Sequence, residues 1–62
     1  MEINVGRVYE AKNGLLVTVL AVSDHGWVDY RRCDAFGCEL PGTRRATTRS
    51  EEFQRRFPLG PI

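Results

Sequence analysis

Lysine, long apolar runs and signal-like segments are scarce in this sequence of 62 residues. Lys12 is the only lysine, against eight arginines. No stretch approaches the roughly 20 consecutive apolar residues of a membrane-spanning helix, so we expect no membrane partner. The start, Met1-Glu2-Ile3-Asn4, is acidic and has no apolar segment. We therefore expect no signal peptide and a location in the cytoplasm.

Sequence signatures of catalysis are also missing. The chain has no GxSxG, Walker, HExxH or paired-acid pattern. Its single histidine, His25, lies between Asp24 and Gly26, which indicates an exposed turn rather than a catalytic base. Zinc requires four ligands, and Cys33 and Cys38 have only His25 to join them. We expect a protein that is not an enzyme and holds no metal or cofactor, with both cysteines reduced in the cytoplasm; a disulfide across residues 33–38 is the alternative.

The charge is small in total but uneven along the chain. The net charge is +1. Residues 1–30 carry two cationic and four acidic side chains, whereas residues 31–62 carry seven cationic and four acidic side chains. Non-specific DNA-binding proteins usually have a much larger basic excess. Arginine makes planar, bidentate contacts with carboxylates as well as with phosphates, so either kind of partner suits the second half.

Turn residues divide the chain into short apolar runs, which we take as one domain over residues 1–62. Asn13-Gly14 is a strong hairpin signal because both residues tolerate positive φ. Gly26 marks a second turn, and Pro41-Gly42 suits the two central positions of a type II turn. Alternation of apolar and polar residues between the turns predicts strands. The expected strands span residues 5–11, 15–23, 27–32, 38–40 and 43–47.

The faces of these strands predict a barrel. The run 15–23 has apolar residues on both faces, which indicates a central strand that is covered on both sides. Alternation in the next strand points Val28 and Tyr30 inward and its charged residues outward. Phe53 and Phe57 are four residues apart and therefore share one helix face. We expect five strands to curl into a small barrel whose open end these two phenylalanines plug.

The end of the chain predicts a short helix at about residues 49–57. Thr48 and Glu51 have the spacing of a capping box, with Thr48 as the N-cap. Acidic residues come first and arginines last, which suits the helix dipole. A tail over residues 58–62 follows. The overall expectation is a mainly β domain with a short C-terminal helix.

Trp27 is the first candidate for a binding surface. It follows the Gly26 turn, where an exposed aromatic residue can anchor a protein interface or stack on a nucleobase. The alternative is that Trp27 covers the second face of the sheet by packing on Val17 or Val19.

The arginines of the second half are the other candidates. They form one basic patch if the strand of Arg31 lies beside that of Arg44 or Arg45. They are split if adjacent arginines point to opposite faces of the sheet. The predicted binding surface consists of Trp27, Arg31, Arg32, Phe36, Arg44, Arg45 and Arg49.

Short motifs over roughly residues 5–57 resemble those of small prophage-encoded proteins with an SH3-like barrel. The motifs are GxVY at residues 6–9, GxxVTV at 14–19, VxYR at 28–31 and EFxxRF at 52–57, with the intervening Arg45-Ala46-Thr47-Thr48. The resemblance implies an SH3-like fold and a phage or mobile-element origin, and with that origin a location in the cytoplasm of a bacterial host. Phage proteins of this size often act on host defence, transcription or recombination machinery. Residues 33–38 and Leu40-Pro41-Gly42 depart from the pattern, so we expect specificity to differ there.

Two functions follow from these observations. The first is an accessory factor that binds and modulates a host protein complex, with Trp27, Tyr9, Tyr30 and Phe36 as anchors. The second is a DNA- or RNA-binding module whose arginines contact phosphates while Trp27 or Phe36 stacks on a base, although the near-neutral charge argues against it. A homodimer through edge strands is also compatible with so small a core.

Overall fold

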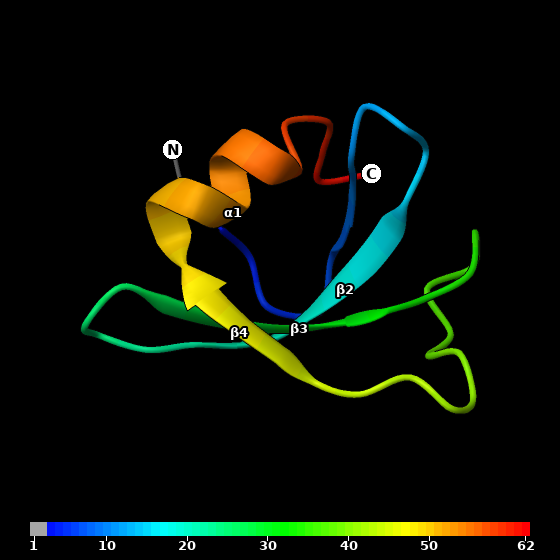
Figure 1. Ribbon diagram of the computed structural model, residues 1–62, viewed down its shortest axis with the longest axis horizontal. Helices are drawn as coiled ribbons and strands as arrows, with labels where there is room; N and C mark the ends of the chain where they lie inside the picture. The colour runs from blue at the N-terminus through cyan, green and yellow to red at the C-terminus, as the bar shows by residue number, and fades with distance from the viewer. Residues whose placement is uncertain (1–2) are drawn as a thin grey trace.

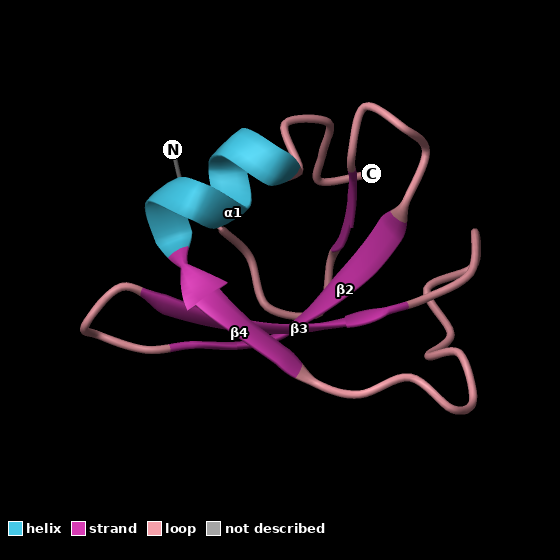
Figure 2. Cartoon of the chain, viewed as in Figure 1, coloured by secondary structure: helices cyan, strands magenta, loops and turns pink. Residues whose placement is uncertain are grey.

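The chain forms one antiparallel sheet with a short helix packed against one of its faces (Figures 1 and 2). The computed structural model describes residues 3–62, so Met1 and Glu2 of the acidic start lie outside the described residues. Each strand pairs antiparallel with the next one in the chain, and the sheet is not closed. The elements are β1 (Val8–Glu10), β2 (Leu16–Val22), β3 (Trp27–Arg32), β4 (Ala46–Arg49) and α1 (Ser50–Arg56). The expectation of a mainly β domain with a short helix is confirmed.

Four strands, rather than the expected five, occur in residues 3–62. The strand expected at 5–11 is shorter because residues 4–7 form a turn, in which Gly6 has a φ of +83°. The strand expected at 38–40 is a single bridge between Cys33 and Glu39. The strand expected at 43–47 begins only at Ala46, since Thr43 belongs to the preceding turn.

Three hairpin turns, at residues 11–15, 23–27 and 34–38, share one geometry. In each, the N–H of the fourth residue, a glycine, donates to the carbonyl of the first at 2.9–3.1 Å. In the first turn this residue is Gly14, with a φ of +92°. Asn13 does not have positive φ, contrary to expectation, and its Oδ1 instead accepts the Leu15 N–H at 3.1 Å. Glycine adopts positive φ without steric cost, which suits it to the position that closes each hairpin.

The turn at Pro41-Gly42 has the expected form. Gly42 has a φ of +80°, and the Thr43 N–H donates to the Leu40 carbonyl at 3.4 Å. Proline at the second and glycine at the third position therefore produce the predicted type II turn.

The hydrophobic core lies between α1 and the sheet. The Phe53 ring centre lies 5.3 Å from that of Tyr9 and 5.4 Å from that of Tyr30, both in edge-on geometry. Phe57 packs beside Phe53 at 4.9 Å, so the two phenylalanines share one face as expected. Edge-on aromatic pairs add to the stabilisation from apolar burial. The buried core consists of Tyr9, Val17, Val19, Val28, Tyr30, Phe53 and Phe57.

Strand β2 is only partly covered, which corrects the expectation for residues 15–23. Val17 and Val19 are buried in the core, whereas Ala21 and Val22 are exposed. The pairing with β3 shifts between Val19 and Ala21, so Leu20 is an extra residue in a bulge. A bulge bends a strand, and the end of β2 beyond it leaves the covered part of the sheet.

Helix α1 begins without the expected capping box. Thr48 is still in β4, paired with Val28, and the N-cap is Arg49, which makes no side-chain capping hydrogen bond. The Ser50 N–H instead donates to the Gly26 carbonyl at 2.8 Å. Strand pairing thus holds Thr48 in extended backbone. The Gly26 carbonyl, in the turn before β3, accepts one of the N–H groups at the start of the helix.

The last residues pair with β1 and are not a free tail. The Glu10 N–H donates to the Leu59 carbonyl at 2.7 Å, and the Leu59 N–H donates back at 3.2 Å. The Ile62 N–H donates to the Val8 carbonyl at 2.8 Å. The C-terminal segment therefore covers the edge of β1 that faces away from β2.

Candidate functional site

The face of the sheet opposite α1, here called the outer face, carries the candidate site. Along β3, Val28 and Tyr30 are buried toward the helix, as expected. Trp27, Asp29 and Arg31 alternate with them and so belong to the outer face.

One half of the outer face is covered by the loop of residues 33–43. Val8, Thr18 and Arg31 form a row across the first three strands. Gly37 of the loop approaches this row so closely that a Cβ there would lie 3.3 Å from Val8 Cγ2. Thr18 and Cys33 are consequently buried although they lie outside the main core.

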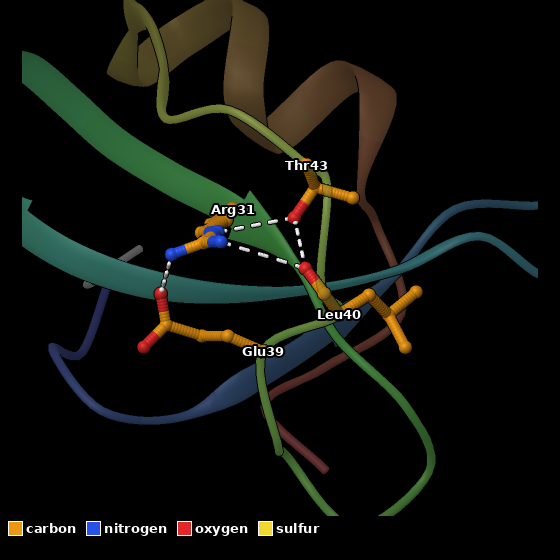
Figure 3. A network of polar contacts seen from close by, with 4 residues as sticks. All are labelled: Arg31, Glu39, Leu40 and Thr43. Atoms are coloured by element: carbon orange, nitrogen blue, oxygen red, sulfur yellow. Dashed lines mark hydrogen bonds and ion pairs between the residues drawn. The ribbon is translucent and has the colours of Figure 1, made fainter.

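Arg31 holds this loop in place (Figure 3). Its Nε donates to Thr43 Oγ1 at 3.0 Å, and its Nη1 forms an ion pair with Glu39 Oε1 at 2.9 Å. Its Nη2 donates to the Leu40 carbonyl at 3.5 Å, which also accepts the Thr43 hydroxyl at 2.6 Å. Arginine has several donors in a rigid plane and can join three groups at once. Arg31 was predicted as a residue that binds a partner. In the structure its guanidinium instead contacts Thr43, Glu39 and Leu40 of the same chain.

The other half of the outer face is open. It is called the Trp27 surface here. Trp27 pairs with Arg49 across β3 and β4, and Asp29 pairs with Thr47. The Arg49 Cζ lies 4.9 Å from the centre of the Trp27 ring, which is the geometry of a cation–π contact. The Trp27 surface consists of Trp27, Asp29, Arg45, Thr47 and Arg49.

Trp27 is 42% exposed. Val17 and Val19 lie in the core beneath α1, and Trp27 is not part of that core. The structure thus favours the exposed reading of Trp27 over packing on these two valines.

The charges on the Trp27 surface are partly balanced within the chain. Asp29 Oδ1 accepts the Thr47 hydroxyl at 2.7 Å, and its Oδ2 lies 3.9 Å from Arg45 Nη1. Asp29 and Thr47 were not in the predicted site. The alternation of β3 places Asp29 outward, but only the register with β4 brings it beside Arg45 and Thr47.

Phe36 lies apart from the Trp27 surface. It is 89% exposed in the turn at residues 34–38, which follows the end of β3 opposite Trp27 (Figure 1). Asp34 Oδ1 accepts the N–H groups of Phe36 and Cys38 at 2.8 and 3.0 Å. These two hydrogen bonds stabilise the turn, but the structure does not bring Phe36 and Trp27 together.

The remaining predicted arginines are also separated. Arg32 follows Arg31 and pairs with Val17, so the two neighbouring arginines alternate between faces. Arg32 and Arg44 are exposed, and neither side chain forms a hydrogen bond or ion pair within residues 3–62. The predicted arginines therefore do not converge on a single patch.

Tyr9 and Tyr30 were expected as anchors for a partner, and this expectation is wrong. Both rings are buried against Phe53. The Tyr9 hydroxyl accepts the Asn4 N–H at 2.9 Å, and the Tyr30 hydroxyl accepts from Arg56 Nη1 at 3.4 Å. A buried tyrosine usually satisfies its hydroxyl in this way while its ring fills the core.

The cysteines lie in the loop of residues 33–43, and His25 lies in the turn that leads into Trp27. Cys33 is buried, Cys38 is exposed, and both thiols are free. Burial, together with the nearby Asp34 and Cys38, raises the pKa of the Cys33 thiol. His25 is exposed in its turn, as expected. Within residues 3–62, no group of three or more His, Cys, Asp or Glu residues could hold a metal ion.

No protein family, curated protein or solved structure matches the chain. No helix of residues 3–62 has the length and apolar character needed to cross a membrane. The local geometry of the outer face is therefore the main guide to function.

Proposed function

We propose that this chain is a non-enzymatic binding domain that presents the Trp27 surface to a partner protein. The observation that carries the proposal is the exposed Trp27 ring with Arg49 stacked on it. Tryptophan and arginine are the residue types that most often dominate the energy of protein interfaces. Strand pairing holds both residues on a regular sheet, so little backbone entropy is lost when a partner binds.

The distribution of charge supports a protein partner over a nucleic acid. Arg31 is paired with Glu39, and Arg45 lies beside Asp29. A groove for phosphates requires several converging cations, since affinity depends on the number of phosphates neutralised. An aromatic centre with mixed charges around it is instead typical of protein interfaces.

The finer fold and origin are part of the same proposal. We infer an SH3-like barrel, with the C-terminal segment at residues 59–62 as the fifth extended segment in place of 43–47. Its hydrogen bonds to β1 and the position of α1 over the core support this inference. The motif resemblance suggests a phage accessory factor that acts in the bacterial cytoplasm on a host complex, such as a defence or transcription system.

A site-specific photo-crosslinker tests the protein partner. A benzophenone side chain is placed at Trp27 in one variant and at Glu51, which is exposed on α1, in a control. In a bacterial lysate we expect the variant at position 27 to form one discrete protein adduct that the control lacks. Arg49→Ala in the same background should weaken this adduct. Equal adducts from the two positions, or none at position 27, would contradict the proposal.

A second experiment tests the alternative function, a DNA- or RNA-binding module. Mobility shifts with duplex DNA, single-stranded DNA and RNA at low salt should show no binding at micromolar protein. Binding that weakens steeply with salt and is lost in Arg49→Ala would replace the protein partner with a nucleic acid.

A further inference from the structure

A second surface lies where the β1–β2 turn meets the last turn of α1. A hollow of about 340 Å³ opens there, and it shares no residue with the Trp27 surface. Three cationic side chains line it: Lys12 from the turn, and Arg55 and Arg56 from the helix. One hollow thus collects a third of the nine cationic side chains of the protein.

The other polar lining of the hollow also suits an anion. Among the described residues, 3–62, no carboxylate lines it. The side-chain oxygen of Asn13 already accepts the Leu15 N–H at 3.1 Å, which leaves its NH₂ group as a donor. The four polar side chains of residues 3–62 that line the hollow, Lys12, Asn13, Arg55 and Arg56, therefore all offer hydrogen-bond donors to a ligand.

The balance of charge at the hollow remains strongly positive. Lys12 has no hydrogen bond or ion pair within residues 3–62, whereas Arg55 Nη1 lies 3.4 Å from Glu52 Oε2. Arg56 donates to the Tyr30 hydroxyl, a neutral group that leaves its charge intact. The C-terminal end of a helix such as α1 contributes at most about −0.5 of a charge, which is much less than the charge of these cations. A single carboxylate would leave an excess of positive charge, whereas a dianion would balance it.

The rest of the lining is apolar. Ala11, Leu15 and Phe57 lie among the cationic side chains. The volume is at the lower end of the roughly 300–1,000 Å³ that small-molecule sites occupy. The hollow therefore has room for an organic group beside the anion.

We propose that this hollow binds a small phosphate monoester. The phosphate dianion lies among Lys12, Arg55 and Arg56, since guanidinium groups match phosphate oxygens in charge and geometry. The attached organic group contacts Leu15 and Phe57. The site is independent of the proposed function because it uses different residues on a different part of the protein.

NMR titration of the ¹⁵N-labelled full chain tests this site. The probes are phenyl phosphate, inorganic phosphate and benzoate, at low ionic strength and about pH 7.5, where the phosphates are mainly dianions. We expect phenyl phosphate to shift the amide signals of residues 11–15 and 55–57 with a Kd of about 1 mM or below. Inorganic phosphate should bind more weakly because it lacks the apolar part, and benzoate more weakly because it carries one charge.

Matched variants separate the site from general charge. Lys12→Ala and Arg55→Ala should each weaken phenyl phosphate binding by about fivefold or more, which is about 1 kcal/mol. Arg32→Ala and Arg44→Ala remove the same charge elsewhere and should leave the affinity unchanged. Equal weakening in all four variants would overturn the proposal.

Two further outcomes also count against it. One is the absence of localised shifts up to about 10 mM phenyl phosphate, where a specific site of this kind would be largely occupied. The other is much tighter binding of a 5′-phosphorylated oligonucleotide, with shifts that extend beyond the hollow. This second result would assign the cations to nucleic-acid backbone rather than to a small phosphate monoester.

Discussion

Arg49 lies over the ring of Trp27, with its Cζ 4.9 Å from the ring centre. The two residues are direct partners in the β3–β4 register, so the contact joins the two strands across the outer face. It lies immediately before α1, because Arg49 is also the N-cap residue of the helix. The contact thus connects the exposed Trp27 surface to the start of the element that covers the core.

Arg49→Ala should lower the free energy of unfolding by about 0.5–1 kcal/mol, the size of an exposed cation–π contact. Trp27 is the only tryptophan, so its fluorescence reports on this site alone. We expect stronger acrylamide quenching of Trp27 in the variant, because the guanidinium no longer covers the ring. Arg44→Ala is the control and should change neither the quenching nor the urea midpoint. Unchanged quenching in Arg49→Ala would show that the contact does not persist in solution.

Phe53 and Phe36 provide a matched pair for the core. Phe53 is buried against Tyr9, Tyr30 and Phe57, whereas Phe36 is 89% exposed. Phe53→Ala should lose about 3–5 kcal/mol and leave the chain largely unfolded, since the core of so small a domain supplies little more. Phe36→Ala should change stability by less than about 0.5 kcal/mol. Circular dichroism during urea unfolding measures both, and similar losses in the two variants would contradict the described core.

Gly60 and Gly42 separate steric contact from backbone preference. Both have positive φ, but a Cβ at residue 60 would lie 2.9 Å from Tyr9 Cδ2, whereas at residue 42 nothing lies within 4 Å. Gly42→Ala should lose about 1 kcal/mol from the backbone preference alone. Gly60→Ala adds a clash with a buried residue and should lose about 1–3 kcal/mol more. Thermal unfolding of the two variants gives the comparison, and a larger loss at Gly42 would reject the packing of the C-terminal segment on β1.

Arg31→Ala should loosen the loop of residues 33–43 without unfolding the sheet. The variant loses the contacts with Thr43, Glu39 and the Leu40 carbonyl. Each net hydrogen bond contributes about 1 kcal/mol, so protection of the Leu40 and Thr43 amides should fall by about fivefold or more in hydrogen exchange. The control is Arg32→Ala, in which these amides should keep their protection. Equal protection in the two variants would mean that the loop is held by other contacts.

The thiol of Cys33 should make stability depend on alkaline pH. Its pKa is raised in the folded chain from an ordinary value of 9.0, first by burial and then by Asp34 and Cys38. The folded state therefore keeps the proton longer than the unfolded state, so stability is full below pH 9.0 and declines as pH rises toward the higher folded pKa. Urea unfolding between neutral and alkaline pH should show a smaller decline for Cys33→Ala than for the wild type. Cys38→Ala retains the buried thiol and most of the decline; identical slopes in all three proteins would refute the assignment.

Features that depend on neighbouring residues were predicted correctly from the sequence. Val28 and Tyr30 are buried because strand alternation depends only on neighbouring residues. Phe53 and Phe57 pack together because their spacing matches one turn of a helix. The turn at Pro41-Gly42 formed as expected because each residue has a φ preference of its own.

The predictions that were wrong are explained by long-range pairing that overrides local sequence signals. Thr48 has the sequence of an N-cap, but its pairing with Val28 keeps it in β4. Tyr9 and Tyr30 are aromatic residues suited to a surface anchor, and packing of α1 on the sheet buries them instead. Residues 59–62 have no strand pattern, and their pairing depends on the free edge of β1.

The sequence by itself determined the β-rich character, the turns at Asn13-Gly14, Gly26 and Pro41-Gly42, the short helix and its two packed phenylalanines, because these depend on local backbone preference and periodicity. Only the tertiary structure decided how the arginines are used. Arg31 holds a loop, Arg45 lies beside Asp29 and Arg49 covers Trp27. The physical reason is that strand register and chain folding choose the partners of a charge, and these partners can be far away in sequence.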